Sequence, residues 1–150
     1  MPSGIPNMRV MKREDLDAVV AIDRLVSGQE RREYYQRKIE SMLNNQHNIN
    51  SSLVAEEGGR IVGFIMGDVY FGEYGIPETT ATIDTLGVHP EYQKHGVASE
   101  LLDQFVTNMK GFGVKKVYTL VNWDDFSLER FFSRHKFVPS KRINLELALP

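Results

Sequence analysis

A β-prone segment that leads through a turn into an amphipathic helix lies in the middle of the chain, and it limits the possible folds most. Residues 79–88 are rich in threonine, isoleucine and valine, which favour an extended strand. Pro90 cannot continue that strand. The apolar residues of 101–109 recur at helical spacing, and Gly111 or Gly113 is expected to end the helix. A strand followed by a helix in this way predicts an α/β fold.

Further strands and helices are expected on both sides of this segment. Gly58 and Gly59 separate two β-prone runs and tolerate the positive φ of a tight hairpin, so the two runs should pair antiparallel. Asp124 and Asp125 are expected to cap the last helix. No repeat or linker divides the sequence, so residues 1–150 should form a single domain. The predicted strands are 8–11, 53–57, 61–70, 79–88, 116–121, 137–138 and 143–149, and the predicted helices are 16–26, 31–43, 101–109 and 126–135.

Composition argues against several classes of function. With 18 basic and 20 acidic side chains the formal net charge is −2, so the chain lacks the basic excess that nucleic-acid phosphates require. Cysteine is absent, which removes disulfides, thiolate metal sites and cysteine nucleophiles. No apolar run reaches the roughly 20 residues of a membrane span, and residues 1–4 lack the apolar stretch of a signal peptide, so we expect a soluble, cytoplasmic protein without a membrane partner. No metal site is expected, because no two of the four histidines have metal-ligand spacing on one helix face: His47, His89, His95 and His135.

The turn before the central helix carries the candidate binding site. Residues 93–98 read Gln-Lys-His-Gly-Val-Ala. A helix N-terminus directs unpaired backbone N–H groups and the positive end of its dipole toward one spot, which suits a pyrophosphate. Gly96 lets the backbone approach a bulky anion, and Ala98 keeps the next position small. An ordinary tight turn into a helix is the alternative interpretation.

The stretch from Ile83 to Ala98 resembles the GNAT superfamily of N-acetyltransferases. The pyrophosphate loop of that family has the pattern Gln/Arg-x-x-Gly-x-Gly/Ala, and residues 93–98 match it fully. Residues 86–88 and Pro90 look like the fourth strand of the family, where a β-bulge splays the sheet and frees backbone groups for the pantetheine amides. The resemblance covers nearly the whole chain and implies a GNAT-like fold: a central, mostly antiparallel mixed sheet, splayed at the fourth strand, with helices on both faces.

The resemblance also implies a reaction and its co-substrate. The acetyl group of acetyl-CoA would be transferred to a primary amine by direct attack in a ternary complex, and the acceptor would be a protein N-terminus, a lysine or a small amine. A non-catalytic coenzyme A binding or sensing module is the alternative, and a homodimer is left open. The residues that the resemblance assigns to the cofactor are Leu86, Gly87, Val88, Gln93, Lys94, His95, Gly96, Val97, Ala98, Ser99 and Asn122.

Asp84 is the candidate general base. It lies two residues before Leu86, at the place where histone-type members of the family carry a glutamate that takes a proton from the amine. A lysine amine has a pKa of about 10.4 and must lose a proton before it attacks. Aspartate is one methylene shorter than glutamate, which favours relay through a water molecule. A carboxylate that is only hydrogen-bonded within the splayed sheet is the alternative interpretation, and Glu73 and Glu78 are fallback bases.

The resemblance does not supply a general acid at its usual position. Many family members protonate the departing thiolate with a tyrosine in a Tyr-x-x-x-Gly-Phe setting on the last helix. Phe132 stands at that place here, and Lys136 replaces the glycine before Phe137. Tyr118 or Tyr74 could take the role, and solvent could also protonate the coenzyme A thiol.

Overall fold

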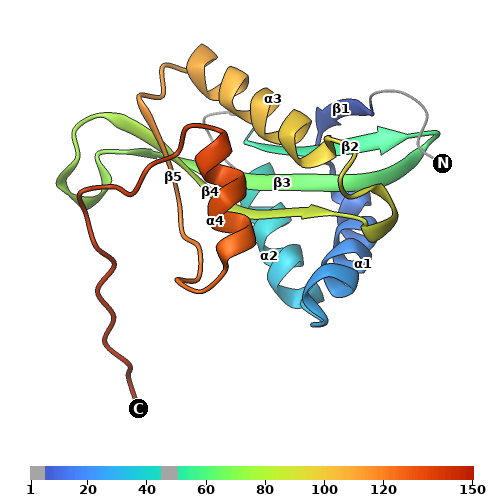
Figure 1. Ribbon diagram of the computed structural model, residues 1–150, viewed down its shortest axis with the longest axis horizontal. Helices are drawn as coiled ribbons and strands as arrows, with labels where there is room; N and C mark the ends of the chain where they lie inside the picture. The colour runs from blue at the N-terminus through green and yellow to red at the C-terminus, as the bar shows by residue number, and fades with distance from the viewer. Residues whose placement is uncertain (1–5, 45–50) are drawn as a thin grey trace. The chain divides into compact units, whose positions relative to one another are not determined.

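The computed structural model describes residues 6–44 and 51–150 (Figure 1). It divides into two compact units, residues 1–119 and 120–150, which are described separately. His47 and residues 1–4, which were considered for a metal site and a signal peptide, lie outside the described residues. The single domain expected from the sequence stays a prediction.

The first unit contains a five-stranded mixed sheet in which the strands follow the order of the sequence. The four strands β1 to β4 are antiparallel neighbours, and β5 runs parallel to β4. This arrangement confirms the predicted α/β class and the predicted hairpin. The elements of the unit are β1 (Asn7–Val10), α1 (Leu16–Ser27), α2 (Arg32–Leu43), β2 (Ser52–Glu57), β3 (Arg60–Phe71), β4 (Thr79–Val88), α3 (Val97–Gly111) and β5 (Lys116–Thr119).

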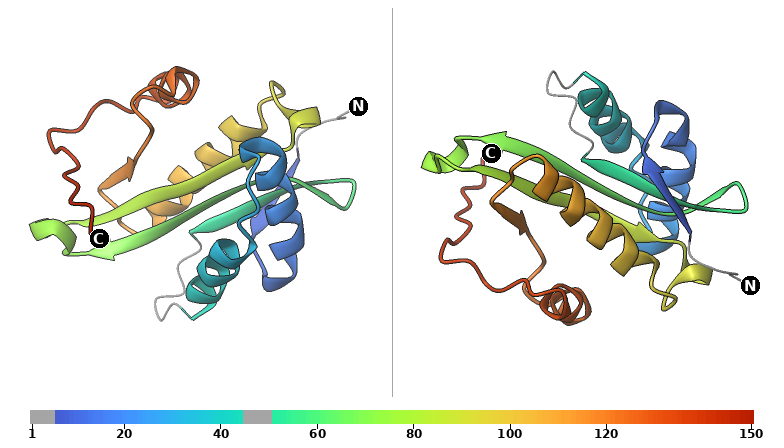
Figure 2. Two further views of the ribbon diagram at one scale, coloured as in Figure 1. Left: turned by 90° about the horizontal axis from the view of Figure 1, so that it is seen from below. Right: turned by 90° about the horizontal axis from the view of Figure 1, so that it is seen from above.

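Helices cover both faces of this sheet. Figure 2 shows α1 and α2 on one face and α3 on the other. Each helix turns a stripe of apolar residues toward the strands, as with Val19 and Ile22 on α1 and Leu101 and Phe105 on α3, all of which are buried. The core therefore lies in two layers, one on each side of the sheet.

A β-bulge interrupts β4 at Asp84. Met66 on β3 pairs with Thr85 and the next residue of β3, Gly67, pairs with Ile83, so Asp84 is the extra residue on β4. β5 pairs with β4 only as far as Ile83. Among the described residues, β4 therefore has no strand neighbour on its β5 side from Asp84 onward, which is the splay that the sequence predicted.

The second unit contains one helix, α4 (Phe126–Arg134), whose two ends are both capped. Asp125 accepts a hydrogen bond from the Leu128 backbone N–H at 3.1 Å, which confirms the expected N-cap. At the other end the N–H of Phe137 donates to the Phe132 carbonyl and the N–H of Lys136 donates to the Ser133 carbonyl. These two bonds form a Schellman motif. The rings of Phe132 and Phe137 pack against each other beside it, with their centroids 5.0 Å apart.

The closing strands predicted at 137–138 and 143–149 are wrong. The structure assigns no regular secondary structure to either segment. A strand needs hydrogen bonds to a neighbouring strand, and alternating hydrophobic residues alone cannot supply that partner. Ile143, Leu145, Leu147 and Leu149 accordingly remain 82–83% exposed.

Candidate functional site

The start of α3 gathers backbone N–H donors at one end of the helix. Gly96 is the N-cap, with φ of +84°, and the helix begins at Val97. The first turn closes where the Glu100 N–H donates to the Gly96 carbonyl at 3.0 Å. The N–H groups of Val97 and Ala98 precede that bond and have no partner within the helix. They form a group of donors at the positive end of the helix dipole.

The segment before the helix makes a sharp turn. Lys94 and Gly96 both take left-handed backbone conformations, with φ of +66° and +84°. The Gln93 side chain donates to the Val88 carbonyl at 3.0 Å and so ties the segment to the end of β4. A Cβ added at Gly96 would meet no atom within 4 Å, so the space above the helix start is open. Glycine is needed here for its backbone conformation, and the open space is available to a ligand.

Gly87 on β4 lies close to the same helix start. A Cβ added at Gly87 would lie 2.8 Å from the Phe64 ring, so close packing requires glycine at this position. A Cβ added at Gly63 would meet both the Val97 side chain at 3.1 Å and the Gly87 carbonyl at 3.2 Å. Two of the predicted site residues, Gly87 of β4 and Val97 of α3, therefore both lie against Gly63 of β3. Leu86 is half-buried and Val88 is buried.

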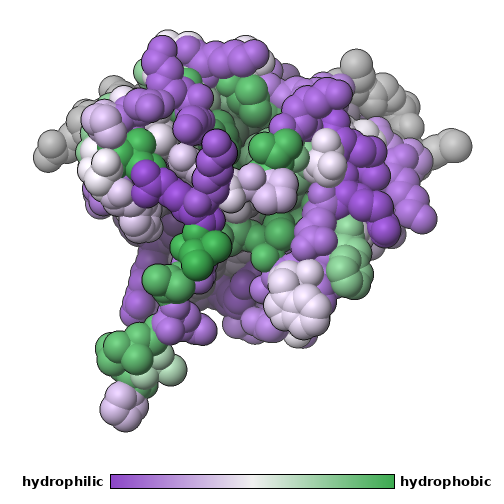
Figure 3. Space-filling model, turned by 60° about the vertical axis from the view of Figure 1, so that its left-hand side comes forward, coloured by the Kyte–Doolittle hydropathy of each residue, from purple (hydrophilic) through white to green (hydrophobic). Residues whose placement is uncertain are grey.

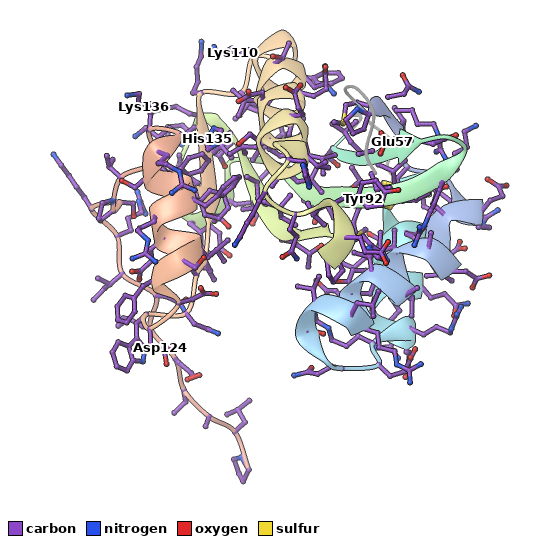
Figure 4. All side chains as sticks on the ribbon, turned by 45° about the vertical axis from the view of Figure 1, so that its right-hand side comes forward. Glu57, Tyr92, Lys110, Asp124, His135 and Lys136 are labelled. Carbon is purple, nitrogen blue, oxygen red and sulfur yellow. The ribbon has the colours of Figure 1, made fainter. Side chains whose placement is uncertain are left out.

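Three side chains that the sequence analysis did not assign to the binding site interact at the turn from β4 to α3. The Arg60 guanidinium lies 3.1 Å from His89 Nε2 and 5.9 Å from the centroid of the Tyr92 ring. His89 Nδ1 accepts a hydrogen bond from the Glu91 N–H at 3.1 Å. Figure 4 labels Tyr92 in this turn. Arg60 adds a positive charge beside the turn, and no local signal could have indicated it because it comes from β3.

The Asp84 side chain is held by Lys38 of α2. Lys38 Nζ donates to Asp84 Oδ2 at 2.5 Å and to Asp68 Oδ2 at 3.1 Å. The Thr82 hydroxyl donates to Asp84 Oδ1 at 3.2 Å. The side chains of Asp84, Lys38 and Asp68 are 21%, 26% and 36% exposed, so the group is partly withdrawn from water. We call Asp68 and Asp84 the carboxylate pair.

Burial and neighbouring charges shift the pKa values of Asp68 and Lys38. Burial raises the pKa of Asp68, and the neighbouring Asp84 carboxylate adds to the rise although Lys38 opposes it. Burial disfavours the charge of Lys38, but its hydrogen bonds to Asp84 and Asp68 outweigh burial and raise its pKa. One ammonium therefore faces two carboxylates, and the cluster has an excess negative charge when both are ionised. Sequence analysis missed Lys38 and Asp68 because each is far from Asp84 along the chain.

The other candidates are more scattered. Tyr118 is half-buried on β5 beside Thr82 of β4, close to the point where the two strands separate. Tyr74 is 82% exposed. Glu73 and Glu78 are exposed residues between β3 and β4. Asn122 and Phe132 belong to the second unit, whose position relative to the helix start is not determined.

The part of the chain that the structure describes shows neither a metal centre nor a membrane segment. Within 6–44 and 51–150, no three histidine, aspartate or glutamate side chains are grouped so that they could hold a metal ion. None of the helices in these ranges has the length and apolar character needed to cross a bilayer.

Comparisons with known proteins agree with this geometry. The model of the acetyltransferase (GNAT) family matches residues 16–137. An acetyltransferase of Pectobacterium atrosepticum is 29% identical over 118 residues, which are 79% of this chain and 77% of that protein. The aminoglycoside N-acetyltransferase AAC(6′)-Iy, solved in complex with CoA, superposes with a TM-score of 0.79 at 14% identity and covers 99% of this chain and 98% of its own.

A second solved structure, Ard1 from Thermoplasma volcanium, superposes with a TM-score of 0.75 at 23% identity. The match covers 91% of this chain and 85% of that one. At these identities the structural likenesses show the fold, whereas the family model spans strands β2 to β5, the helix start and α4. The chain belongs to the acetyltransferase (GNAT) family.

Proposed function

We propose that the protein transfers an acetyl group from acetyl-CoA to a primary amine by direct attack of the amine in a ternary complex. The observation that carries this proposal is the start of α3. The backbone N–H groups of Val97 and Ala98 lie there beside open space at Gly96, close to the part of β4 that, among the described residues, has no strand neighbour on its β5 side from the Asp84 bulge onward. Membership of the acetyltransferase family supports transfer of an acyl group.

The residues at the helix start fit a diphosphate. The N–H groups of Val97, Ala98 and Ser99 can donate to its oxygens, and the exposed side chains of Lys94 and His95 can reach the same anion. On β4, the backbone of Leu86–Val88 can pair with the pantetheine amides along the free edge. When bound, acetyl-CoA would supply an activated acetyl thioester. The chain holds and orients it, and backbone donors polarise the carbonyl under attack.

In this proposal Asp84 accepts the proton of the amine, through a water molecule. The carboxylate pair and Lys38 together carry an excess negative charge, which favours a cationic acceptor. The ammonium of the acceptor can replace Lys38 as the partner of Asp84. The acceptor then gives up a proton to Asp84 through the water molecule. Tyr118, beside the splayed edge, is the candidate to return a proton to the thiolate.

The proposal is tested by incubating the protein and acetyl-CoA with a panel of peptides and small amines, following thiol release and identifying products by mass spectrometry. Asp84→Asn should lower kcat by about 10²-fold or more, the usual contribution of a general base, and leave CoA affinity unchanged. Glu78→Gln is the matched control, because Glu78 is an exposed carboxylate before the same strand. Normal kcat and an unaltered pH–rate profile in Asp84→Asn would exclude this role for Asp84.

A non-catalytic coenzyme A binding or sensing module is the second candidate function. It is favoured by the Lys38 hydrogen bond, which occupies the candidate base, and by Phe132, which has no proton to donate. Such a module would be thermally stabilised by acetyl-CoA and release no thiol with any amine. A cytoplasmic location stays a prediction from the sequence.

A further inference from the structure

Lys38 is, among the described residues, the lysine that the fold withdraws most from water. Its side chain is 26% exposed, and it comes from α2, on the face of the sheet opposite α3 (Figure 2). Hydrophilic residues, in purple, cover much of the face shown in Figure 3, as is usual for solvated charged side chains. The other lysines follow that rule, since all are exposed: Lys12, Lys94, Lys110, Lys115, Lys116, Lys136 and Lys141.

The amine of Lys38 lies where an acceptor amine would have to lie. Its Nζ is 2.5 Å from Asp84 Oδ2 and 3.1 Å from Asp68 Oδ2. A general base acts on an amine at hydrogen-bond distance or through one water molecule, and the chain's own amine meets that condition at Asp84. Asp84 is also the bulged residue beyond which β4 has no described strand neighbour on its β5 side. The proposed function places acetyl-CoA along that stretch.

We propose that Lys38 is a self-acetylation site, whose Nζ attacks the thioester carbonyl carbon of acetyl-CoA bound to the same chain. This inference rests on the proposed function and names one acceptor for it. The ammonium first loses a proton to Asp84, and the free amine then forms the N–C bond as the C–S bond breaks. The nitrogen loses a second proton as the amide forms, and the departing thiolate takes up one. Overall, one proton is released to solvent.

Acetylation removes the ammonium that lies between the two members of the carboxylate pair. A neutral amide cannot balance two carboxylates, so the excess negative charge increases and a cationic acceptor should bind more tightly. The hydrogen bonds to Asp84 and Asp68 raise the pKa of Lys38, which makes the free amine scarce and the reaction slow. Its fixed position beside Asp84 acts in the opposite direction. Lys38 is therefore modified once per chain, and later acetyl groups go to other acceptors.

The first test incubates the full chain with acetyl-CoA in the absence of an acceptor and maps the acetylated residues by mass spectrometry of peptides. Lys38 should be acetylated at least about tenfold faster than any exposed lysine, because its amine is already positioned at the base. The control is Arg37→Lys with Lys38→Arg, which moves the amine one residue along α2 to a side chain that is 80% exposed. That lysine should react only as fast as the other exposed lysines. Equal rates at Lys38 and at exposed lysines would overturn the proposal.

The second test distinguishes reaction within one chain from reaction between chains. Asp84→Asn keeps the amine without the base, and Lys38→Arg keeps the base without this amine. Asp84→Asn, alone or mixed with Lys38→Arg, should be acetylated at Lys38 at least about tenfold more slowly than the native chain. The native rate constant should not change with protein concentration. Acetylation of Asp84→Asn at the native rate, alone or in the mixture, would exclude the proposed step.

The third test measures stability instead of turnover. A chain acetylated at Lys38 should unfold at the same lowered urea midpoint as Lys38→Gln, since both lack the ammonium. An acetylated chain with the native midpoint would overturn the release of the carboxylate pair. Acetylation of added amines without acetylation of Lys38 would exclude this inference and leave the proposed function standing. A chain that acetyl-CoA stabilises thermally but that acetylates neither itself nor any amine would exclude both.

Discussion

Lys38 is a single positive charge placed between two carboxylates from neighbouring strands. Asp68 and Asp84 each accept a hydrogen bond from its ammonium, and the pKa of Asp68 is raised by burial and by Asp84. Without the ammonium, the pair would consist of two partly buried carboxylates that repel each other. The stability of this part of the sheet should therefore depend on Lys38 and on pH.

Lys38→Gln should lower the free energy of unfolding by about 1–2 kcal/mol at pH 7 and by much less near pH 3.5. The folded-state pKa of Asp68 is already raised, and removing the ammonium raises it further above its unfolded value of about 3.9, so the stability of the variant falls as pH rises through that folded pKa. Urea unfolding across this pH range measures the effect. Arg37→Gln is the control on the same helix, with an exposed ion pair worth about 0.5 kcal/mol or less. A loss independent of pH would contradict the charge argument.

Lys136 occupies a position that usually belongs to glycine. It follows α4 with φ of +73°, and its N–H completes the Schellman motif. A non-glycine residue in this conformation costs roughly 1 kcal/mol. Lys136→Gly should therefore stabilise the fold by about 1 kcal/mol, measured as a higher midpoint in urea. Lys136→Ala keeps the Cβ and the strain, and it should give no gain. Equal stabilisation by both variants would show that the side-chain charge, not the backbone, limits stability.

The start of α3 has two separable requirements, a left-handed backbone at Gly96 and open space above it. Asparagine tolerates the left-handed conformation but adds a side chain in that space. Gly96→Asn should therefore weaken CoA binding at least tenfold, measured by calorimetry, while stability changes by less than about 1 kcal/mol.

The matched control for this variant is Gly28→Asn at the end of α1. Gly28 has φ of +76° and also lacks neighbours within 4 Å of an added Cβ. It should lose the same small amount of stability and bind CoA normally. Tight binding by Gly96→Asn would show that the diphosphate does not lie against this helix start.

The elements that local sequence determines were predictable, and those that depend on distant partners were not. The hairpin at Gly58 and Gly59, the α3 stripe and the turn at Gly96 follow from neighbouring residues, and the structure contains all of them. Lys38 reaches Asp84 across 46 positions of sequence, so no spacing rule could have identified it. The strand predicted at 143–149 failed for the same reason, since its alternation indicates a strand but not a neighbour to pair with.

On the scale of the whole molecule, β1, α1 and β2 are joined by one network of charges. Arg9 on β1 donates to both carboxylate oxygens of Asp15 at 2.8 Å and to Glu56 on β2 at 2.7 Å. Asp15 also accepts the Lys12 N–H at 2.7 Å, just before α1. Burial alone would raise the pKa of Asp15, but the hydrogen bonds from Arg9 and Lys12 outweigh it and lower the pKa.

A group with a lowered folded-state pKa stabilises the fold above its unfolded pKa, here about 3.9, and this stabilisation is lost as pH falls through the folded pKa. Asp15→Asn should therefore cost about 2–3 kcal/mol at pH 7, because the half-buried Arg9 guanidinium loses the charge of the buried Asp15 carboxylate. The cost should shrink as pH falls below about 3.9 toward the lower folded-state pKa, because the native carboxylate then loses its charge as well. Urea unfolding of both proteins from pH 7 to pH 2.5 measures this convergence. Asp17→Asn, with an 85% exposed carboxylate, should change stability by about 0.5 kcal/mol or less throughout. Parallel curves for Asp15→Asn and the native chain would place the acid sensitivity of the fold elsewhere.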